Sequence, residues 1–284
     1  MFIWLASYPK SGNTLARALL AAYFFSEDGI FNFDLIKNIK QFPHYGIFKK
    51  LGINVKNEKE VVKNYIKAQE FINQKDSVQF LKTHSYLFNI DNNSFTDLNN
   101  TLGAIYVVRD PRNVVTSYAH HSNISVDEAA DQLINSWHYG GNLNSNQISE
   151  RTLVYLGTWK SNFNSWKSFK EPGRYMLIKY EDLINNKEET LLKILEFIHK
   201  LKKVNFVVDQ KKLKNVLEST NFEKMKDLEK RKGFSESKIN KKTGEKIPFF
   251  NLGAENVWEK NLSSKIRDKI ENSFKKEMIE LGYL

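Results

Sequence analysis

The sequence predicts an α/β fold, a single three-layer domain with a central parallel sheet. Short apolar runs that favour strands alternate with helical patterns along the 284 residues, and this alternation is typical of parallel βαβ units. The chain shows no internal repeat, no low-complexity tract and no linker. With 41% hydrophobic residues, it can bury one large core. We therefore expect one domain over residues 1–284.

Four segments are expected to form the sheet. Residues 2–6 are apolar and stop before a turn, and residues 78–82 alternate in the way a strand does. Residues 101–108 are apolar throughout, which predicts a strand buried on both faces. Residues 175–179 form the fourth expected strand.

The expected helices begin at recognisable signals. The first follows the turn after residues 2–6 and starts at Thr14. Asp110 is expected to cap a helix that starts at Pro111, and Ser125 with Glu128 forms a capping box. Further helices are expected over residues 159–166, 188–201 and 263–280. Residues 26–75 are poorly periodic and are predicted to form a helical excursion.

Composition excludes several functional classes. The chain has no cysteine, so disulfides, cysteine-based zinc sites and thiol catalysis are excluded. No stretch approaches the roughly 20 apolar residues of a membrane span, and we expect a cytoplasmic protein. The six histidines do not form an HExxH motif, so no metal site is expected.

The net charge of +10 suits an anionic partner. Residues 224–246 hold nine basic and four acidic side chains, so the net charge of this segment is half of the net charge of the whole chain. This segment is either a solvated loop or a basic lid over an anionic ligand, and we assign the lid to residues 224–250. Basic and acidic residues are interleaved there without aromatic partners, so nucleic-acid binding is not expected.

The strongest chemical signal lies in residues 7–14, between the first strand and the first helix. Gly12 permits a positive φ, and successive N–H groups before a helix form an anion site. Lys10 adds a positive charge, and Ser11 and Thr14 add hydroxyl donors. The order of residues differs from the GxxxxGK[ST] signature of nucleoside triphosphate sites. The alternative is an ordinary turn with a surface lysine.

These residues begin an ordered set of motifs that resembles the PAPS-dependent sulfotransferases, whose cosubstrate is 3′-phosphoadenosine 5′-phosphosulfate (PAPS). Residues 8–14 (YPKSGNT) resemble the 5′-phosphosulfate loop, and residues 80–84 (FLKTH) resemble the strand end with the catalytic histidine. Residues 106–118 resemble the 3′-phosphate motif. Further similar segments are residues 157–166, 179–183 and 220–225. The resemblance implies a fold related to P-loop nucleotide kinases.

The resemblance also implies three catalytic residues. His84 would take the proton of the acceptor hydroxyl as general base. Lys10 would stabilise the charge that develops on the leaving oxygen, and Lys82 would hold the transferring group. The reaction needs positioning and electrostatics rather than a metal.

The implied PAPS-binding residues come from five motifs. Arg109 has the forked donors that suit a phosphate, and its motif would bind the 3′-phosphate. The aromatic residues would contact the adenine, or belong to the core alone. The full set is Ser11, Gly12, Asn13, Thr14, Arg109, Ser117, Tyr180, Thr220, Phe222, Asn251, Leu252 and Gly253.

Two departures from the family pattern stand out. Leu15 occupies the position of a tryptophan that stacks on the adenine. Asn251 and Leu252 occupy the positions of an arginine and a lysine that grip the 3′-phosphate. We hypothesise that cations of the lid, which include Arg231 and Lys232, partly replace them.

The predicted function is sulfuryl transfer from PAPS to a hydroxyl of a small-molecule or glycan-like acceptor. Residues 26–75 and the segment after His120 are expected to line the acceptor pocket. The acceptor and the oligomeric state are not predicted. Two alternatives stay open: a non-catalytic nucleotide-binding protein of the same fold, and a P-loop-type small-molecule kinase.

Overall fold

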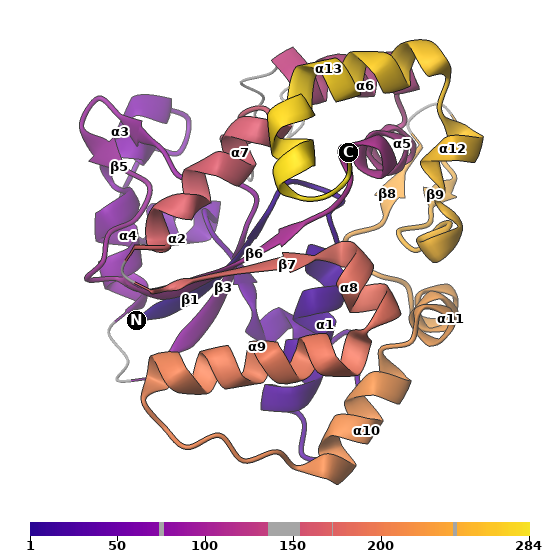
Figure 1. Cartoon of the computed structure of the whole chain (residues 1–284). Helices are drawn as coiled ribbons and strands as arrows, with labels where there is room; N and C mark the ends of the chain where they lie inside the picture. The colour runs from indigo at the N-terminus through magenta and orange to yellow at the C-terminus, as the bar shows by residue number, and fades with distance from the viewer. Residues whose placement is uncertain (74–76, 136–153, 172, 241–242) are drawn as a thin grey trace.

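The structure is a computed structural model of the whole chain (Figure 1). It describes residues 1–73, 77–135, 154–171, 173–240 and 243–284.

A five-stranded parallel sheet forms the centre of the described structure, in the order β2-β3-β1-β6-β7. The four predicted strands are confirmed as β1 (Phe2–Ser7), β3 (Gln79–Thr83), β6 (Thr101–Val108) and β7 (Tyr175–Lys179). The fifth, β2 (Lys40–Gln41), is a two-residue edge strand beside β3. Its shortness explains why no periodic pattern marks it in the sequence.

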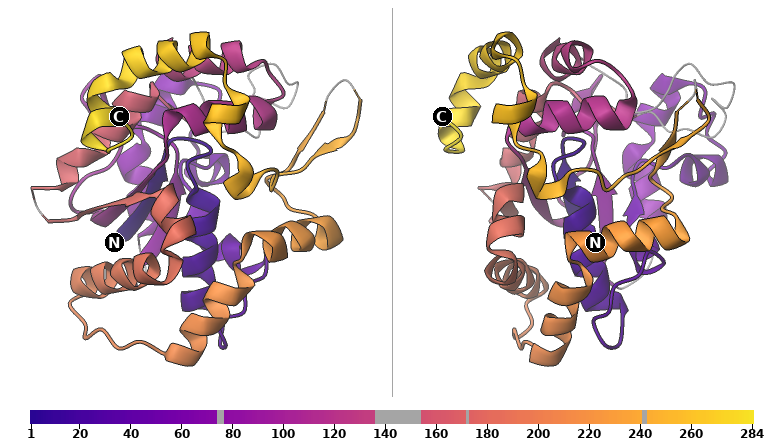
Figure 2. Two further views of the ribbon diagram at one scale, coloured as in Figure 1. Left: turned by 45° about the vertical axis from the view of Figure 1, so that its right-hand side comes forward. Right: turned by 90° about the vertical axis from the view of Figure 1, so that its right-hand side faces the viewer.

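Both faces of the sheet are buried, as the apolar pattern predicted. Phe2 and Trp4 of β1 point into one core, and Ile3 and Leu5 point into the other. The second core lies under α1 (Asn13–Phe25), α8 (Tyr180–Asn185), α9 (Lys187–Lys202), α10 (Gln210–Ser219) and α11 (Phe222–Lys232). The first lies under α5 (Pro111–Ser122), α6 (Val126–Asn135), α7 (Trp159–Trp166) and α13 (Ser264–Glu280) (Figures 1 and 2). The predicted three-layer fold is confirmed.

Capping hydrogen bonds confirm two of the predicted helix starts. The Asp110 carboxylate accepts a hydrogen bond from the backbone N–H of Arg112 at 2.9 Å. The Ser125 hydroxyl accepts one from the N–H of Glu128 at 3.1 Å. Asp110 also forms a 2.7 Å ion pair with Arg112, so this carboxylate is committed to the helix start.

Of the predicted helical excursion, residues 26–73 fold largely as short helices around an aromatic cluster, and residues 74–75 lie outside the described residues. The elements are η1 (Leu35–Asn38), α2 (Tyr45–Lys50), α3 (Glu58–Lys63) and α4 (Tyr65–Ile72). Phe42, Phe48 and Tyr65 are fully buried and pack ring against ring. These aromatic residues therefore complete the core.

After α11 the chain forms a β-hairpin that projects from the body of the molecule (Figure 2). Its strands are β8 (Lys238–Ile239) and β9 (Lys246–Ile247). The chain then returns through η4 (Gly253–Glu255) and α12 (Trp258–Asn261) to α13. Two small elements complete the fold: the hairpin of β4 (Asn89–Ile90) with β5 (Asn93–Ser94), and η3 (Lys167–Phe169).

Candidate active site

The candidate site is a cavity of about 1300 Å³ at the carboxyl ends of the strands. The loop of residues 8–12 follows β1, His84 follows β3, Arg109 follows β6 and Tyr180 follows β7. In open parallel sheets, ligands bind at this edge. The topology thus collects side chains that lie far apart in the sequence.

Nearly all of the predicted site residues line this one cavity. Lys10 and His84 face the same space, which a shared reaction requires. Ser11 is the exception, since it is fully buried in the loop behind the wall. The predicted residues that line the cavity are Lys10, Gly12, Asn13, Thr14, Lys82, His84, Arg109, Ser117, Tyr180, Thr220, Phe222, Asn251, Leu252 and Gly253.

Backbone conformation shapes the loop after β1. Lys10 and Gly12 both have positive φ angles, of 65° and 100°. A Cβ at Gly12 would lie 2.5 Å from Cδ2 of Tyr180, so only glycine allows this ring against the loop. The buried Ser11 hydroxyl has no hydrogen-bond partner among the described residues, which is consistent with a ligand group.

Asn13 holds this loop against the sheet. Its side-chain amide donates to the carbonyl of Leu5 at 3.0 Å and to the Ser7 hydroxyl at 3.2 Å. The amide nitrogen therefore faces β1, and the backbone of Asn13 forms the cavity-facing start of α1. The predicted binding role of Asn13 stays a prediction for its backbone.

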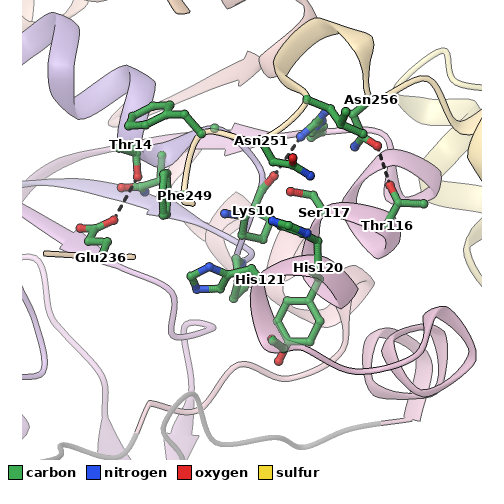
Figure 3. Close-up of a pocket in the computed structure, with 18 of the residues that line it drawn as sticks. Lys10, Thr14, Thr116, Ser117, His120, His121, Glu236, Phe249, Asn251 and Asn256 are labelled. Carbon is green, nitrogen blue, oxygen red and sulfur yellow. Dashed lines mark hydrogen bonds between the residues drawn. The ribbon is translucent and has the colours of Figure 1, made fainter. Parts of the chain in front are cut away.

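Lys10 lies in an environment that weakens its charge. Its Nζ is 3.8 Å from the centroid of the Phe249 ring, and both residues face the cavity (Figure 3). Burial lowers the pKa of Lys10 to about 7, the neighbouring Arg109 contributes to the lowering, and Glu236 opposes it. An anionic ligand would restore the charged form.

His84 is held in one tautomer by the end of β1. Its Nδ1 lies 2.8 Å from the Ser7 carbonyl oxygen. Because a carbonyl only accepts hydrogen bonds, Nδ1 carries the proton and Nε2 is left with a lone pair. Burial, with Lys82 nearby, lowers the pKa of His84 to about 3. The imidazole is therefore neutral and able to accept a proton.

Lys82 contacts an acid that the sequence did not single out. Its Nζ lies 3.2 Å from Oε1 of Glu236, and the same carboxylate pairs with Arg17 at 2.5 Å. Glu236 Oε2 also accepts a hydrogen bond from Thr14 Oγ1 at 3.2 Å (Figure 3). Residues of α1, β3 and the lid segment thus meet at one carboxylate.

Arg109 is stacked rather than ion-paired. Its Cζ is 4.2 Å from the centroid of the Tyr180 ring, and its Nη1 donates to the Lys10 carbonyl at 3.4 Å. Its Nε is buried and has no partner among the described residues. This guanidinium therefore has donor capacity for an anion.

Thr220 and Phe222 line the cavity at the start of α11. The Thr220 hydroxyl donates to the carbonyl of Val216 at 2.6 Å, and its own carbonyl accepts from Lys187 Nζ at 3.3 Å. A Cβ at Gly253 would lie 2.6 Å from the Phe222 ring. This close approach explains why a glycine follows Asn251 and Leu252.

The two lid cations of our hypothesis lie elsewhere. Arg231 and Lys232 are exposed in the last turn of α11 and are not among the described residues that line the cavity. Lys238, further along the same segment, does line it. The replacement therefore stays a prediction, and Lys238 is the cation of this segment that lies at the cavity in this conformation.

Several cavity residues had escaped the sequence analysis. They include Lys187, Glu236, Lys238 and Asn256. Asn256 is buried and accepts a hydrogen bond from Thr116 Oγ1 at 2.8 Å (Figure 3). For Glu236, the available signal was an acid inside a basic segment, which is too common to identify a contact.

Both segments that were predicted to line an acceptor pocket contribute residues to the cavity. Gln41 lines the cavity from residues 26–75, and His121, Ile124 and Val126 line it after His120. Burial, with Lys10 and Lys238 nearby, lowers the pKa of His121 to about 2. His120 and His121 face the cavity beside Lys10 (Figure 3).

The described residues hold neither a metal-binding cluster nor a membrane-spanning helix. Among them, no cluster of three or more histidine and acidic side chains is arranged to hold a metal ion. In the same part of the chain, every helix is too short or too polar to cross a membrane.

The chain is similar in sequence to known proteins. A family model described as the sulfotransferase domain matches residues 2–282. Luciferin sulfotransferase of Photinus pyralis is 25% identical over 231 residues, which are 79% of this chain and 56% of that protein. Flavonol 3-sulfotransferase of Flaveria bidentis is 23% identical over 278 residues, or 95% of this chain and 79% of that protein. The chain thus matches little more than half the length of the luciferin enzyme.

Solved structures share the fold. Retinol dehydratase in complex with androsterone and the inactive cofactor PAP has a TM-score of 0.61 at 16% identity, over 98% of this chain and 80% of that one. A mouse sulfotransferase complexed with PAP has a TM-score of 0.58 at 17% identity, over 97% and 83%. The chain therefore belongs to the sulfotransferase domain family, as its ordered motifs predicted.

Proposed function

We propose that this chain transfers a sulfuryl group from PAPS to a hydroxyl group, with His84 as general base. The observation that carries the proposal is the bond from His84 Nδ1 to the Ser7 carbonyl. It leaves Nε2 unprotonated in the cavity that Lys10 also lines. Family membership and the PAP-bound relatives support the choice of donor.

In the proposed reaction, Nε2 of His84 removes the proton of the acceptor hydroxyl. The acceptor oxygen then bonds to sulfur while the bond from sulfur to the 5′-phosphate oxygen breaks. Protonated Lys10 stabilises the charge that builds on this leaving oxygen. A general base of this kind is worth about 10²–10⁴-fold in rate.

The chain's own donors fit the proposed nucleotide. The start of α1, which Gly12, Asn13 and Thr14 bring to the cavity, suits the 5′-phosphosulfate. The free Nε of Arg109 suits the 3′-phosphate, with the Ser117 hydroxyl in the same cavity. By contrast, the pairing of Asp110 with Arg112 does not favour the kinase alternative, because that carboxylate is not available for Mg²⁺.

The proposed acceptor is a small molecule with an apolar body. The cavity volume of about 1300 Å³ exceeds the range of roughly 300–1,000 Å³ for single-ligand pockets, so a nucleotide and an acceptor fit together. Ile124, Val126, Val154 and Leu156 add apolar wall. Relatives named for luciferin and flavonol point to ring-bearing alcohols and phenols.

The test is transfer of label from sulfur-labelled PAPS to a panel of apolar alcohols and phenols, with a metal chelator present. We expect labelled product from the wild type and almost none from His84→Asn. Transfer that instead requires ATP and Mg²⁺ would establish the kinase alternative. Binding of PAP without any labelled product across the panel would favour the non-catalytic alternative.

A further inference from the structure

Glu236 brings a negative charge into a cavity that is otherwise suited to anions. Its carboxylate contacts Thr14 Oγ1 at 3.2 Å, Arg17 Nη1 at 2.5 Å and Lys82 Nζ at 3.2 Å. Two of these three partners, Thr14 and Lys82, are residues that the family resemblance assigns to PAPS. A protein carboxylate therefore occupies donors that the nucleotide needs.

Arg17 is a cation that the family resemblance does not assign. It lies one turn after Thr14 on α1, and its side chain is 6% exposed. Its Nη2 donates to the carbonyls of Ile36 and Ile39 at 3.4 and 3.2 Å, which fixes the guanidinium. Its Nε has no partner among the described residues. The group is rigidly placed and aimed at Glu236.

The charges around this point do not balance. Arg17 and Lys82 are 6% and 8% exposed and share one carboxylate. A buried cation without a counter-charge is costly, so this pair requires an anion in the absence of ligand. Burial would raise the pKa of Glu236, but Lys82 and Arg17 hold it well below its usual range. Glu236 is thus a fixed anion.

We propose that Thr14, Arg17 and Lys82 form an oxyanion subsite for the transferable sulfuryl group, and that Glu236 fills this subsite until the donor binds. The proposal rests on the proposed function for the identity of the donor. It adds Arg17 to the binding residues. It also makes Glu236 an internal competitor, because the sulfuryl oxygens must take over the donors that now bond to the carboxylate.

The supports on the two sides of the contact differ in a way that allows this exchange. Arg17 and Lys82 belong to α1 and β3, at the centre of the fold, whereas Glu236 is 24% exposed on the connection between α11 and β8. The lid has another anchor, since buried Glu229 accepts from the N–H groups of Phe249 and Phe250 at 2.8 and 2.9 Å. Glu236 can therefore leave while the lid stays attached.

Inorganic sulfate tests the subsite without any nucleotide. In Glu236→Gln the subsite loses its internal negative charge, so millimolar sulfate should raise the melting temperature by about 3 °C or more over chloride of equal ionic strength. The wild type and Glu245→Gln should show almost no response. Glu245 is an exposed acid of the same lid segment, so its variant matches the loss of charge. The double variant Arg17→Gln/Glu236→Gln should lose the response.

The absence of a sulfate response in folded Glu236→Gln would overturn the proposal. So would an equal response in Glu245→Gln, since sulfate would then bind elsewhere. If Glu236→Gln binds sulfate but the wild type fails to bind PAP, the subsite stands and the proposed function fails. The two conclusions are thus separable.

Amide hydrogen exchange of the wild type provides a test that needs no variant. PAPS should accelerate exchange in residues 235–240, because Glu236 is displaced. PAP lacks the sulfuryl group and should leave that exchange nearly unchanged. Slower exchange in these residues with PAPS would mean that Glu236 stays as a latch, and would overturn the exchange that we propose.

Discussion

The two halves of the cavity are built in different ways. The strand-end half consists of the loop after β1, Lys82, His84 and Arg109. It is fixed by the buried sheet, by the His84–Ser7 bond and by a glycine that admits the Tyr180 ring. The other half, here called the lid half, is formed by the lid segment and the residues that follow it to Asn256, and a few side chains such as Glu229, Glu236 and Asn256 hold it in place.

Because of this difference, we expect the two halves to contribute differently to catalysis and to nucleotide binding. The proposed catalytic groups all lie in the strand-end half, where their positions follow from the fold itself. The lid half holds one of the two departures from the family, at Asn251 and Leu252, whereas the other, Leu15, lies on α1. We therefore expect substitutions in the strand-end half to change turnover, nucleotide affinity or both, and substitutions in the lid half to change nucleotide affinity alone.

The largest expected effect is that of His84→Asn. Loss of the general base should lower kcat by about 10²–10⁴-fold, while PAP affinity stays within about twofold. The exposed cap residue His44 gives the matched control His44→Asn, which should keep full activity. The pKa of His84 is about 3, so the imidazole stays unprotonated down to about pH 5. Protonation of His84 should therefore not lower the wild-type kcat between about pH 7 and about pH 5.

The next effect is a pH dependence of binding. Lys10 has a pKa of about 7, so it is charged below that pH and must take up a proton to bind an anion above it. PAP affinity should fall by up to about tenfold per pH unit above pH 7. Calorimetric titration at several pH values measures this. In Lys10→Arg the fall should vanish, and a flat profile in the wild type would contradict the account.

Arg109→Lys should have an effect of about tenfold, because lysine lacks the planar fork of donors. The loss should concern PAP and not AMP, which has no 3′-phosphate. Comparing the two dissociation constants isolates the 3′-phosphate contribution. Equal losses for both nucleotides would show that Arg109 acts only through its stack on Tyr180.

PAP affinity should increase when cations are introduced in the lid half of the cavity. Asn251→Arg with Leu252→Lys restores two cations at positions that line the cavity, and PAP affinity should rise by roughly tenfold. The control ligand is again AMP, which should gain far less. If PAP affinity stays the same, these positions do not face the 3′-phosphate.

The smallest expected effect is that of Arg231→Gln with Lys232→Gln. Both side chains are exposed at the end of α11, so PAP affinity should change by less than about twofold at fixed salt. A tenfold loss would mean that α11 moves over the nucleotide. It would also support the hypothesis that these two cations partly replace the missing ones.

The sequence predicted the sheet and the strand-end half because their constraints are local. An apolar strand such as residues 101–108 can only be buried, and Gly12 marks a tight turn beside a helix start. Contacts across the lid were not predictable in this way. Glu236 meets Arg17 across more than two hundred residues, and nothing in its neighbouring residues indicates the partner. The edge strand β2 was not predicted, because a strand of two residues shows no periodic pattern of apolar side chains.

The central claim is that the cavity holds a 3′-phosphorylated adenine nucleotide between Lys10, Arg109 and His84. Calorimetric titration of the wild-type chain with PAP, ATP and AMP, with and without Mg²⁺, tests it most directly. We predict that PAP binds at least about tenfold more tightly than either other nucleotide, without any need for the metal. Mg²⁺-dependent binding of ATP, at equal or higher affinity than PAP, would contradict the account.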